Sequence, residues 1–358
     1  MQVREIKTNK ERKEYIDFIY KVYKNDKKFC DMNLLFVKSF LYQKEQHTKR
    51  LQIIPIMIQD DGIKLVCMFV IDETNEVKLS FLEFLPNSQK YLKALIQYAK
   101  ELLKIYKKKK VVVGVNGQIS YGLGILTDKY NQKFEFNANY NRDYYTKELD
   151  QTFTTIKRAY SYEYQAKHVL NFFDEKMLEN TYKKYQFRFL DVKHFKRDML
   201  IFGKLAHESL KTTPYYSAKT DYEMYELMKQ LKFIMKKEDI IFAMKNGKEV
   251  GFVFNHPDYA ELFDRPKLNY IRFYLRYLFK KPKRIIYNVI GVLPGYQLSG
   301  IAAALIHKAI VTRKDIYTEG VSSFILEDNI PSTKLSRKLS TGINKEYHLY
   351  ELEGDDDA

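Results

Sequence analysis

The order in which strand-like and helix-like segments follow one another most constrains the fold, because the same order occurs twice. Each half begins with a strand-like run and a helical segment, continues through hairpin strands, and then has a helix and an apolar strand. Two halves of one topology indicate a tandem, mixed α/β protein. We predict domains at residues 1–165 and 186–354, joined by a helical connector at 166–185.

Several segments give clear local signals. Asn246-Gly247 lies between two alternating apolar runs and predicts a hairpin turn. The apolar run Arg284–Val292 predicts a strand, and Ser299–Arg313 predicts the helix that follows it. In the first half, the stretches at 133–141 and 156–165 look like closing strands.

Composition excludes several classes of protein. The chain has 358 residues, 45% of them hydrophobic, which is enough for two ordinary cores. Cys30 and Cys67 are its only cysteines, so we expect a reducing compartment and neither a disulfide framework nor a cysteine zinc site. The seven histidines show no metal-ligand spacing, so we expect no metal.

The charge and the apolar runs bear on partners and location. The net charge of +16 attracts polyanions, but much of the lysine stands beside acidic residues at helical spacing, so nucleic-acid binding is not favoured. The charged beginning is no secretory signal, and no uncharged apolar run has membrane-spanning length. We therefore expect a cytoplasmic protein.

The stretch Val289–Ile310 carries the strongest functional signal. An apolar strand runs through the loop Leu293–Ser299 into an alanine-rich helix. A helix N-terminus offers unpaired N–H groups and a positive dipole end, so it can hold an anion. Gly300 and the alanines after it reduce side-chain bulk there. Tight packing of the helix on a sheet is the competing explanation.

Two motifs resemble those of the GNAT acyltransferase superfamily. "VLPGYQLSGIAAAL" is similar to its acyl-CoA loop, whose pattern Gln/Arg-x-x-Gly-x-Gly/Ala is filled by Gln297, Gly300 and Ala302. "FILEDNIPSTKLSRKL" resembles its second cofactor motif, with Asn329 and Ser332 at the positions that touch the CoA arm. Nearly the whole chain also looks like a bacterial family of tandem GNAT-like acyltransferases.

The resemblance implies an N-acyltransferase that uses acetyl-CoA or a longer acyl-CoA, with an unknown small-molecule or peptide amine as acceptor. The thioester would lie between the strands ending at Val292 and Leu326, its carbonyl polarised by a backbone N–H near Val292 or Leu293. The implied CoA-binding residues are Val292, Leu293, Gln297, Leu298, Ser299, Gly300, Ile301, Ala302, Ala303, Asn329 and Ser332.

The sequence departs from the family at the catalytic acid. Many members have a tyrosine where this chain has Ser336, so we consider Tyr347 or Tyr350 on the last strand. For the base we consider Glu327, Tyr287 or Glu208. Glu327 follows a strand beside the cofactor, where burial can raise a carboxyl pKa, although it equally suits a cap for the next helix.

The first half lacks the phosphate loop. At the matching place it has "FLEFLPNSQKYLKAL", with bulky Tyr91 and Leu92 and no glycine, so we expect this half not to bind CoA. Two other functions stay open. One is an aminoacyl-tRNA-dependent transferase of similar tandem fold, and the other is a non-catalytic CoA-binding or scaffold protein. The oligomeric state is also open.

The segment 267–284 predicts a basic amphipathic helix. Ile271, Tyr274, Leu275 and Leu278 share one face, beside a row of arginine and lysine. Such a helix either covers the surface of the protein or makes peripheral contact with an anionic membrane.

Overall fold

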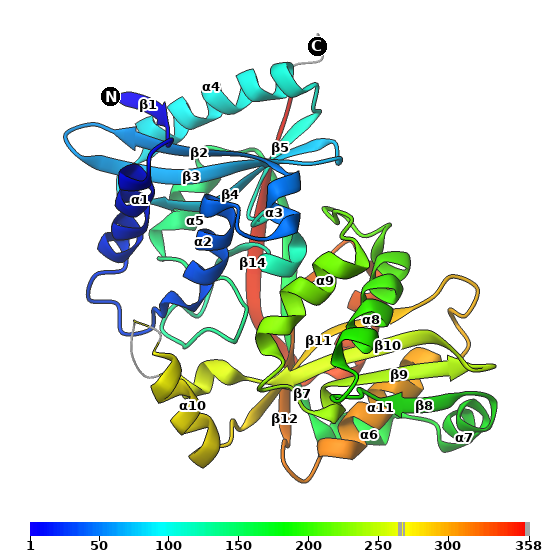
Figure 1. The fold of residues 1–358 in the computed structure, drawn as a ribbon. Helices are drawn as coiled ribbons and strands as arrows, with labels where there is room; N and C mark the ends of the chain where they lie inside the picture. The colour runs from blue at the N-terminus through cyan, green and yellow to red at the C-terminus, as the bar shows by residue number, and fades with distance from the viewer. Residues whose placement is uncertain (264–266, 268, 355–358) are drawn as a thin grey trace. The chain divides into compact units, whose positions relative to one another are not determined.

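The computed structural model describes residues 1–263, 267 and 269–354, which form two compact units (Figure 1). The first unit is built from Met1–Ala159, Leu262–Phe279 and the chain from Lys345 onward. The second is built from Tyr160–Glu261 and Lys280–Asn344. Mixed α/β architecture, as predicted, is confirmed in both.

The first unit contains a sheet in the order β1-β2-β3-β4-β5-β14. Its neighbours are antiparallel except β4 and β5, which are parallel and are connected through helix α4. The bounds are β1 Gln2–Glu5, β2 Gln52–Gln59, β3 Ile63–Ile71, β4 Glu76–Phe84, β5 Lys110–Val113, β14 Gly342–Glu353 and α4 Gln89–Tyr106. The short strand β6, Ile125–Leu126, pairs with β14.

The other helices of the first unit have identifiable local causes. In α1, Thr8 and Glu11 form a capping box, which satisfies two of the free N–H groups at the helix start. Helix α2 buries Leu34, Val37, Ser39, Phe40 and Leu41, and it was not predicted. The bounds are α1 Asn9–Val22, α2 Leu34–Tyr42, α3 Gln46–Arg50, α5 Tyr144–Asp150 and α10 Tyr270–Phe279.

The second unit contains a sheet in the order β7-β12-β11-β10-β9-β8, in which β11 and β12 are the parallel pair. The predicted hairpin turn is confirmed: Asn246 and Gly247 have φ of 51° and 74°, as a two-residue type I′ turn requires. The bounds are β7 Thr155–Gln165, β8 Gln186–Phe189, β9 Ile240–Lys245, β10 Lys248–Pro257, β11 Arg284–Val292, β12 Glu319–Ser322 and β13 Ile325–Leu326.

Helices cover both faces of this second sheet. Helix α8 packs Phe202 on Phe252 and Phe254 of β10, with α9 beside it. On the opposite face, α11 packs Leu305 on Val253. The bounds are α6 Ala166–Phe172, α7 Glu175–Lys184, α8 Phe195–Leu210, α9 Asp221–Met228, α11 Ile301–Arg313 and α12 Ile330–Leu339.

One predicted strand was wrong. Residues 133–141 contain no strand, and Asn137, in a turn at 136–137, has φ of 67°, outside the β region. The side chain of Asn141 replaces a strand partner, because it accepts from the Leu126 N–H at 2.7 Å and donates to the Leu126 carbonyl at 3.1 Å. The backbone N–H and C=O of Leu126 are therefore satisfied by a side chain here, and not by a neighbouring strand.

Each unit contains a strand from the other half of the sequence. Tyr350 of β14, near the C-terminus, pairs with Val113 of β5 in the first unit (Figure 1). Tyr164 of β7, from the first half, pairs with Gly320 of β12 in the second unit. The predicted domain limits are contiguous in sequence, and they differ from the compact units by this exchange and by Leu262–Phe279.

Candidate functional site

In the second unit, the parallel strands β11 and β12 separate part-way along their length. They pair from Arg284 opposite Glu319 as far as Tyr287 opposite Ser322. Asn288 is then bulged out of register with β10, and the Ser323 hydroxyl donates to its carbonyl at 2.9 Å. Beyond this point β11 continues along β10, whereas β13 pairs with β7. Beyond Tyr287 and Ser322 the two strands no longer pair, and we call the place where they part the opening between β11 and β12.

The open edge of β11 presents backbone amides to this opening. The Leu293 N–H donates to the Val250 carbonyl at 2.9 Å, so it points toward β10. Because N–H directions alternate along a strand, the amides of Val292 and Ile290 point to the opposite edge. Of the two predicted donors for a thioester carbonyl, Leu293 is therefore already engaged, and Val292 has the required direction.

The loop after β11 ends at the N-terminus of α11. Gln297 and Leu298 are exposed, and the Ser299 hydroxyl donates to the Tyr296 carbonyl. The first backbone bond of the helix runs from the Ala304 N–H to the Gly300 carbonyl, at 3.0 Å. In the described part of the chain, no acceptor engages the amides of residues 301–303. Three unpaired N–H donors at the positive end of a helix dipole suit an anion.

Gly300 is required for a different reason from the one predicted. Its φ is 84°, a left-handed conformation that favours glycine. A Cβ on Gly300 would lie 2.5 Å from Oγ1 of Thr181, which belongs to α7. Gly300 therefore permits the turn and the packing of α7. The small side chains of Ala302 and Ala303, which are partly buried, leave the approach to the amides clear. The Ile301 side chain is buried, so only its amide N–H is left for a ligand.

The second motif lies at the start of α12. Asn329 caps this helix, since its Oδ1 accepts from the Ser332 N–H at 3.4 Å. Thr333 fixes the preceding turn through a hydrogen bond to the Leu326 carbonyl at 3.2 Å. The Oδ1 of Asn329 is used to cap the helix, whereas its Nδ2 can still donate to a ligand.

The matching junction of the first unit is filled by the protein's own side chains. At the start of α4, the Glu148 carboxylate accepts from the N–H groups of Asn87 and Ser88, at 2.7 and 2.6 Å. Where β4 and β5 separate, the Ser80 hydroxyl donates to the Val115 carbonyl at 2.8 Å, and Asn116 accepts from the Phe81 N–H at 2.8 Å. An internal carboxylate takes the position of an anion, and two side chains bridge the strands.

Comparison with known proteins identifies this construction. No protein-family model matches the sequence, and no curated protein matches it. In structure, the chain is similar to a tandem GNAT protein from the clavulanic acid biosynthesis pathway, with a TM-score of 0.54, 9% identity and 99% of both chains covered. The chain has the tandem GNAT fold.

Two further solved structures have this fold in common with the chain. One is a probable N-acyltransferase from Enterococcus faecalis V583, with a TM-score of 0.55, 8% identity, and 98% of this chain and 71% of that chain covered. The other is a GCN5-related glucosamine N-acetyltransferase region of a fungal multi-domain β-N-acetylglucosaminidase. Its TM-score is 0.57 at 10% identity, and the match covers 98% of this chain and 38% of that one.

Within the GNAT fold, the candidate bases do not have the predicted surroundings. Glu327 is exposed, so the burial on which its selection depended is absent. Glu208 is half-buried and pairs with Lys211 at 2.8 Å. Burial, with a smaller effect of Tyr164, raises the pKa of Tyr287. A tyrosine with a raised pKa keeps its proton, so Tyr287 suits a proton donor and not a base.

A tyrosine reaches Ser336 from a different element. Ser336 is buried on α12, and the Tyr164 hydroxyl of β7 lies beside the hydroxyls of Ser336 and Ser322. The ring of Tyr164 meets Tyr287 edge to face, with centroids 5.7 Å apart. Burial raises the pKa of Tyr164. Sequence reasoning missed this residue because it assigned β7 to the first half.

The predicted acid Tyr347 belongs to the first unit, so it is not among the residues that the second unit gathers at the loop. It is buried, pairs with Leu126 of β6, and packs against Gly124. These contacts give it a packing role in β14.

A buried histidine beside the bulge was also missed. His256 Nδ1 lies 2.9 Å from the Pro257 carbonyl, and its Nε2 lies 3.4 Å from Nδ2 of Asn288. Burial lowers the pKa of His256 to about 4. The ring is therefore neutral near pH 7, and it can hold the Asn288 side chain where the strands separate. Nothing in the spacing of the histidines indicates this contact.

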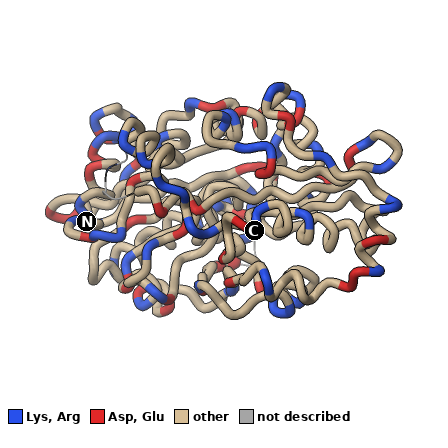
Figure 2. The backbone as a smooth tube through the Cα atoms, turned by 90° about the horizontal axis from the view of Figure 1, so that it is seen from below, with Lys and Arg blue, Asp and Glu red and all other residues tan. Residues whose placement is uncertain are grey.

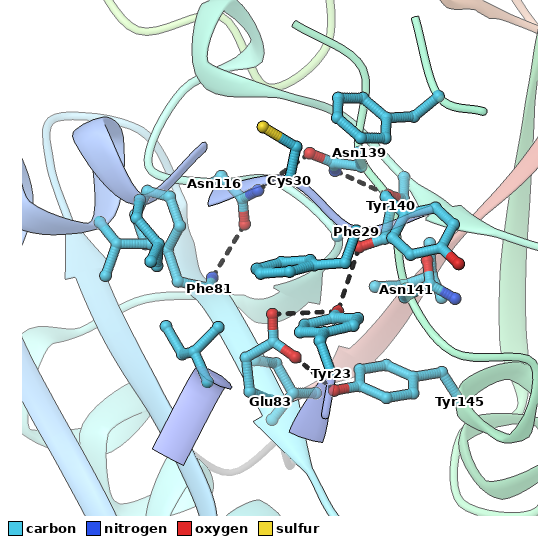
Figure 3. A pocket seen from close by; sticks show the side chains of 18 of the residues that line it. Tyr23, Phe29, Cys30, Phe81, Glu83, Asn116, Asn139, Tyr140, Asn141 and Tyr145 are labelled. Atoms are coloured by element: carbon cyan, nitrogen blue, oxygen red, sulfur yellow. Dashed lines mark hydrogen bonds between the residues drawn. The ribbon is translucent and has the colours of Figure 1, made fainter. Parts of the chain in front are cut away.

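The first unit contains a cavity of about 80 Å³ between α1, β4 and the segment 114–141. Figure 3 shows the hydroxyls of Tyr23 and Tyr145 directed at the carboxyl of Glu83, and the Tyr23 hydroxyl lies 3.3 Å from Oε1. Phe29 stacks on Tyr23 with centroids 4.2 Å apart. Burial raises the pKa of Glu83 to about 8, so this carboxyl is mostly protonated near pH 7.

Proposed function

We propose that the protein is an acyl-CoA-dependent N-acyltransferase whose second unit holds the acyl-CoA. The observation that carries this proposal is the free amides at the start of α11 beside the opening between β11 and β12. At the matching junction of the first unit, the Glu148 carboxylate binds the amides of Asn87 and Ser88, just before α4. The names of the fold's solved relatives, two of them N-acyl- or N-acetyltransferases, support the same reaction class.

The residues of the second unit suit the parts of an acyl-CoA molecule. The amides of residues 301–303, with the exposed Gln297, match the pyrophosphate. The Val292 N–H is directed toward the place where a thioester carbonyl would be polarised. The side chains of Asn329 and Ser332 match the pantetheine arm. We propose acetyl as the transferred group, with an amine as acceptor.

In this reaction the amine nitrogen forms a bond to the thioester carbon, and the carbon–sulfur bond then breaks. The amine must lose a proton, and the exposed carboxylate of Glu327 or water can accept it. The leaving thiolate must gain a proton. Tyr164 and Tyr287 remain protonated because burial raises the pKa of both, so they suit this step.

Calorimetric titration of acetyl-CoA, and then of octanoyl-CoA, into wild-type protein and Ala302→Glu tests the proposal. A carboxylate at the second position of α11 repels the pyrophosphate and opposes the amides, and we expect affinity to fall by about 30–100-fold. Ala302 is a better probe than Gly300, whose substitution disturbs α7.

Ala94→Glu is the matched control. Ala94 is partly buried, as Ala302 is, and it lies on α4 of the first unit. We expect this variant to bind acetyl-CoA within about twofold of wild type, since the proposal assigns no acyl-CoA contact to α4. Folded wild type that binds neither acyl-CoA would refute the proposal, as would equal losses in the two variants.

One observation favours a second candidate, a CoA-binding protein without turnover. Ser336 stands where many GNAT members have their acid, and Glu327 is exposed. Release of CoA thiol from acetyl-CoA, measured with a panel of primary amines and polyamines, separates the two. Turnover with any amine excludes the non-catalytic candidate, while acetyl-CoA binding without turnover on the panel favours it.

A further inference from the structure

Helix α10 of the first unit directs its apolar face to solvent. Ile271, Tyr274, Leu275 and Leu278 follow the i, i+3, i+4, i+7 spacing of a single helical stripe. Their exposed fractions are 75, 51, 51 and 56%. None of the residues of α10 is buried. An apolar stripe of a helix normally faces the core, so this orientation is inverted.

The opposite side attaches the helix to its unit. The Phe273 ring stacks on Phe263 with centroids 5.3 Å apart, and on Tyr277 at 6.5 Å. Phe273 and Tyr277 are only partly exposed. The aromatic side of the helix thus determines the direction in which the apolar stripe faces. Tyr270 and Phe279, the first and last residues of α10, are 63 and 87% exposed.

The charged residues within the segment 267–284 are all of one sign. The segment contains seven lysines and arginines and no aspartate or glutamate. Along much of the rest of the chain, basic and acidic residues are interspersed (Figure 2), although a further run of lysines stands at 107–110. Arg272 and Lys280 are exposed, whereas Arg284 pairs with Asp258 at 2.8 Å, and Glu261 accepts from the N–H groups of Lys283 and Arg284. An apolar stripe bordered by exposed cations matches one kind of partner, an anionic lipid surface.

We propose that α10 docks the protein on an anionic membrane, with its apolar stripe at the level of the lipid headgroups and its cations on the phosphates. Ten residues make a helix of about 15 Å, which lies in the interface and does not cross the bilayer. In the described part of the chain, no helix is long and apolar enough to cross a membrane. Tyr274 of the stripe places its hydroxyl at the polar boundary, as aromatic residues do at membrane surfaces.

Co-sedimentation with vesicles tests the proposal on the full chain. Vesicles of phosphatidylcholine with about 30% phosphatidylglycerol, in about 0.1 M salt, provide the anionic surface, and pure phosphatidylcholine provides the neutral one. We expect the wild type to bind the anionic vesicles about 100-fold more tightly than the neutral ones. The double variant Leu275→Glu/Leu278→Glu should lose about 100-fold on the anionic vesicles.

Ile105→Glu is the matched control. Ile105 is 68% exposed on α4 of the same unit and is followed by a run of lysines, so it has the same chemistry without the stripe. We expect its binding to stay within about twofold of wild type. Equal losses in both variants, or equal binding to neutral and anionic vesicles, would overturn the proposal, as would no binding of the wild type.

The absence of tryptophan in the chain allows a direct readout of contact. Leu278→Trp introduces a single reporter whose emission should shift to the blue on anionic vesicles and be quenched by brominated lipid. Emission unchanged by vesicles overturns the proposal. Light scattering that shows wild-type dimers and monomeric Leu275→Glu/Leu278→Glu also overturns it, because the stripe would then contact a second copy of the chain.

Discussion

Replacing Glu83 with glutamine should make the protein more stable at alkaline pH and remove part of its pH dependence. The rise of the Glu83 pKa from its ordinary value of 4.5 to about 8 corresponds to about 5 kcal/mol at 1.36 kcal/mol for each tenfold change. The Glu83 carboxyl also borders the cavity, and we therefore expect ionisation of Glu83 to lower the free energy of unfolding by about 2–5 kcal/mol.

The sign follows from proton binding. Below the ordinary pKa, both the folded and the unfolded chain hold the Glu83 proton, and there is no difference. Between pH of about 4.5 and about 8 the unfolded chain releases this proton while the folded chain retains it, so stability falls as pH rises. Above about 8 the loss is complete. Glutamine does not titrate, and its side-chain oxygen can still accept from the Tyr145 hydroxyl, as a carboxyl oxygen of Glu83 does.

Urea denaturation at about pH 5 and about pH 8.5, followed by circular dichroism, measures the effect. The free energy of unfolding of Glu83→Gln relative to wild type should be about 2–5 kcal/mol higher at the upper pH than at the lower one. Glu101→Gln, which changes an exposed carboxylate of the same unit, should show no such difference. Parallel pH dependence in wild type and Glu83→Gln would refute the reasoning.

Three further substitutions separate the roles assigned above. Tyr164→Phe removes the hydroxyl beside Ser336, and kcat should fall by about 100-fold while calorimetry shows the Kd for acetyl-CoA within about twofold; an unchanged kcat excludes Tyr164 as the acid. Glu148→Gln weakens the two hydrogen bonds to the start of α4, and urea denaturation should show that the free energy of unfolding falls by about 1–3 kcal/mol. An unchanged midpoint would contradict this role. Gly300→Ala should lower the free energy of unfolding by about 1–3 kcal/mol, because of the positive φ and the contact with Thr181. Adding Thr181→Ala should restore only the part that the steric contact costs, and no recovery would contradict the contact.

Local signals predicted the second unit's central elements well. The strand Arg284–Val292 has the predicted bounds, because an apolar run is enclosed by prolines on both sides. Helix α11 begins two residues later than predicted, because Gly300 takes a left-handed conformation and ends the loop. The predicted hairpin turn is also present, since it depends on neighbouring residues alone.

Features that depend on distant pairings were not predictable. The choice of β5 as the partner of β14, and of β12 as the partner of β7, joins segments far apart in the chain, and no local pattern encodes it. The position of Tyr164 follows from that exchange. Glu148 and Glu83 are ordinary acidic residues in the sequence, and only folding places one on two backbone amides and the other between two tyrosines.

The GNAT fold by itself gives neither the reaction nor the acceptor, because function depends on the site and not on the fold. In the second unit, the opening between β11 and β12, the amides of residues 301–303 and the hydroxyl of Tyr164 form a set that suits acyl transfer. In the first unit, Glu148, Ser80 and Asn116 fill the matching positions. The two halves thus have one topology and different junctions.

Hydrogen–deuterium exchange of the full-length wild type, with and without saturating acetyl-CoA, tests the central claim most directly. The account predicts slower exchange in peptides that cover residues 292–303, where the free amides lie, and no change at residues 86–92, where Glu148 already occupies the start of α4. Protection at residues 86–92 with none at 292–303 would contradict it and would assign the acyl-CoA to the first unit.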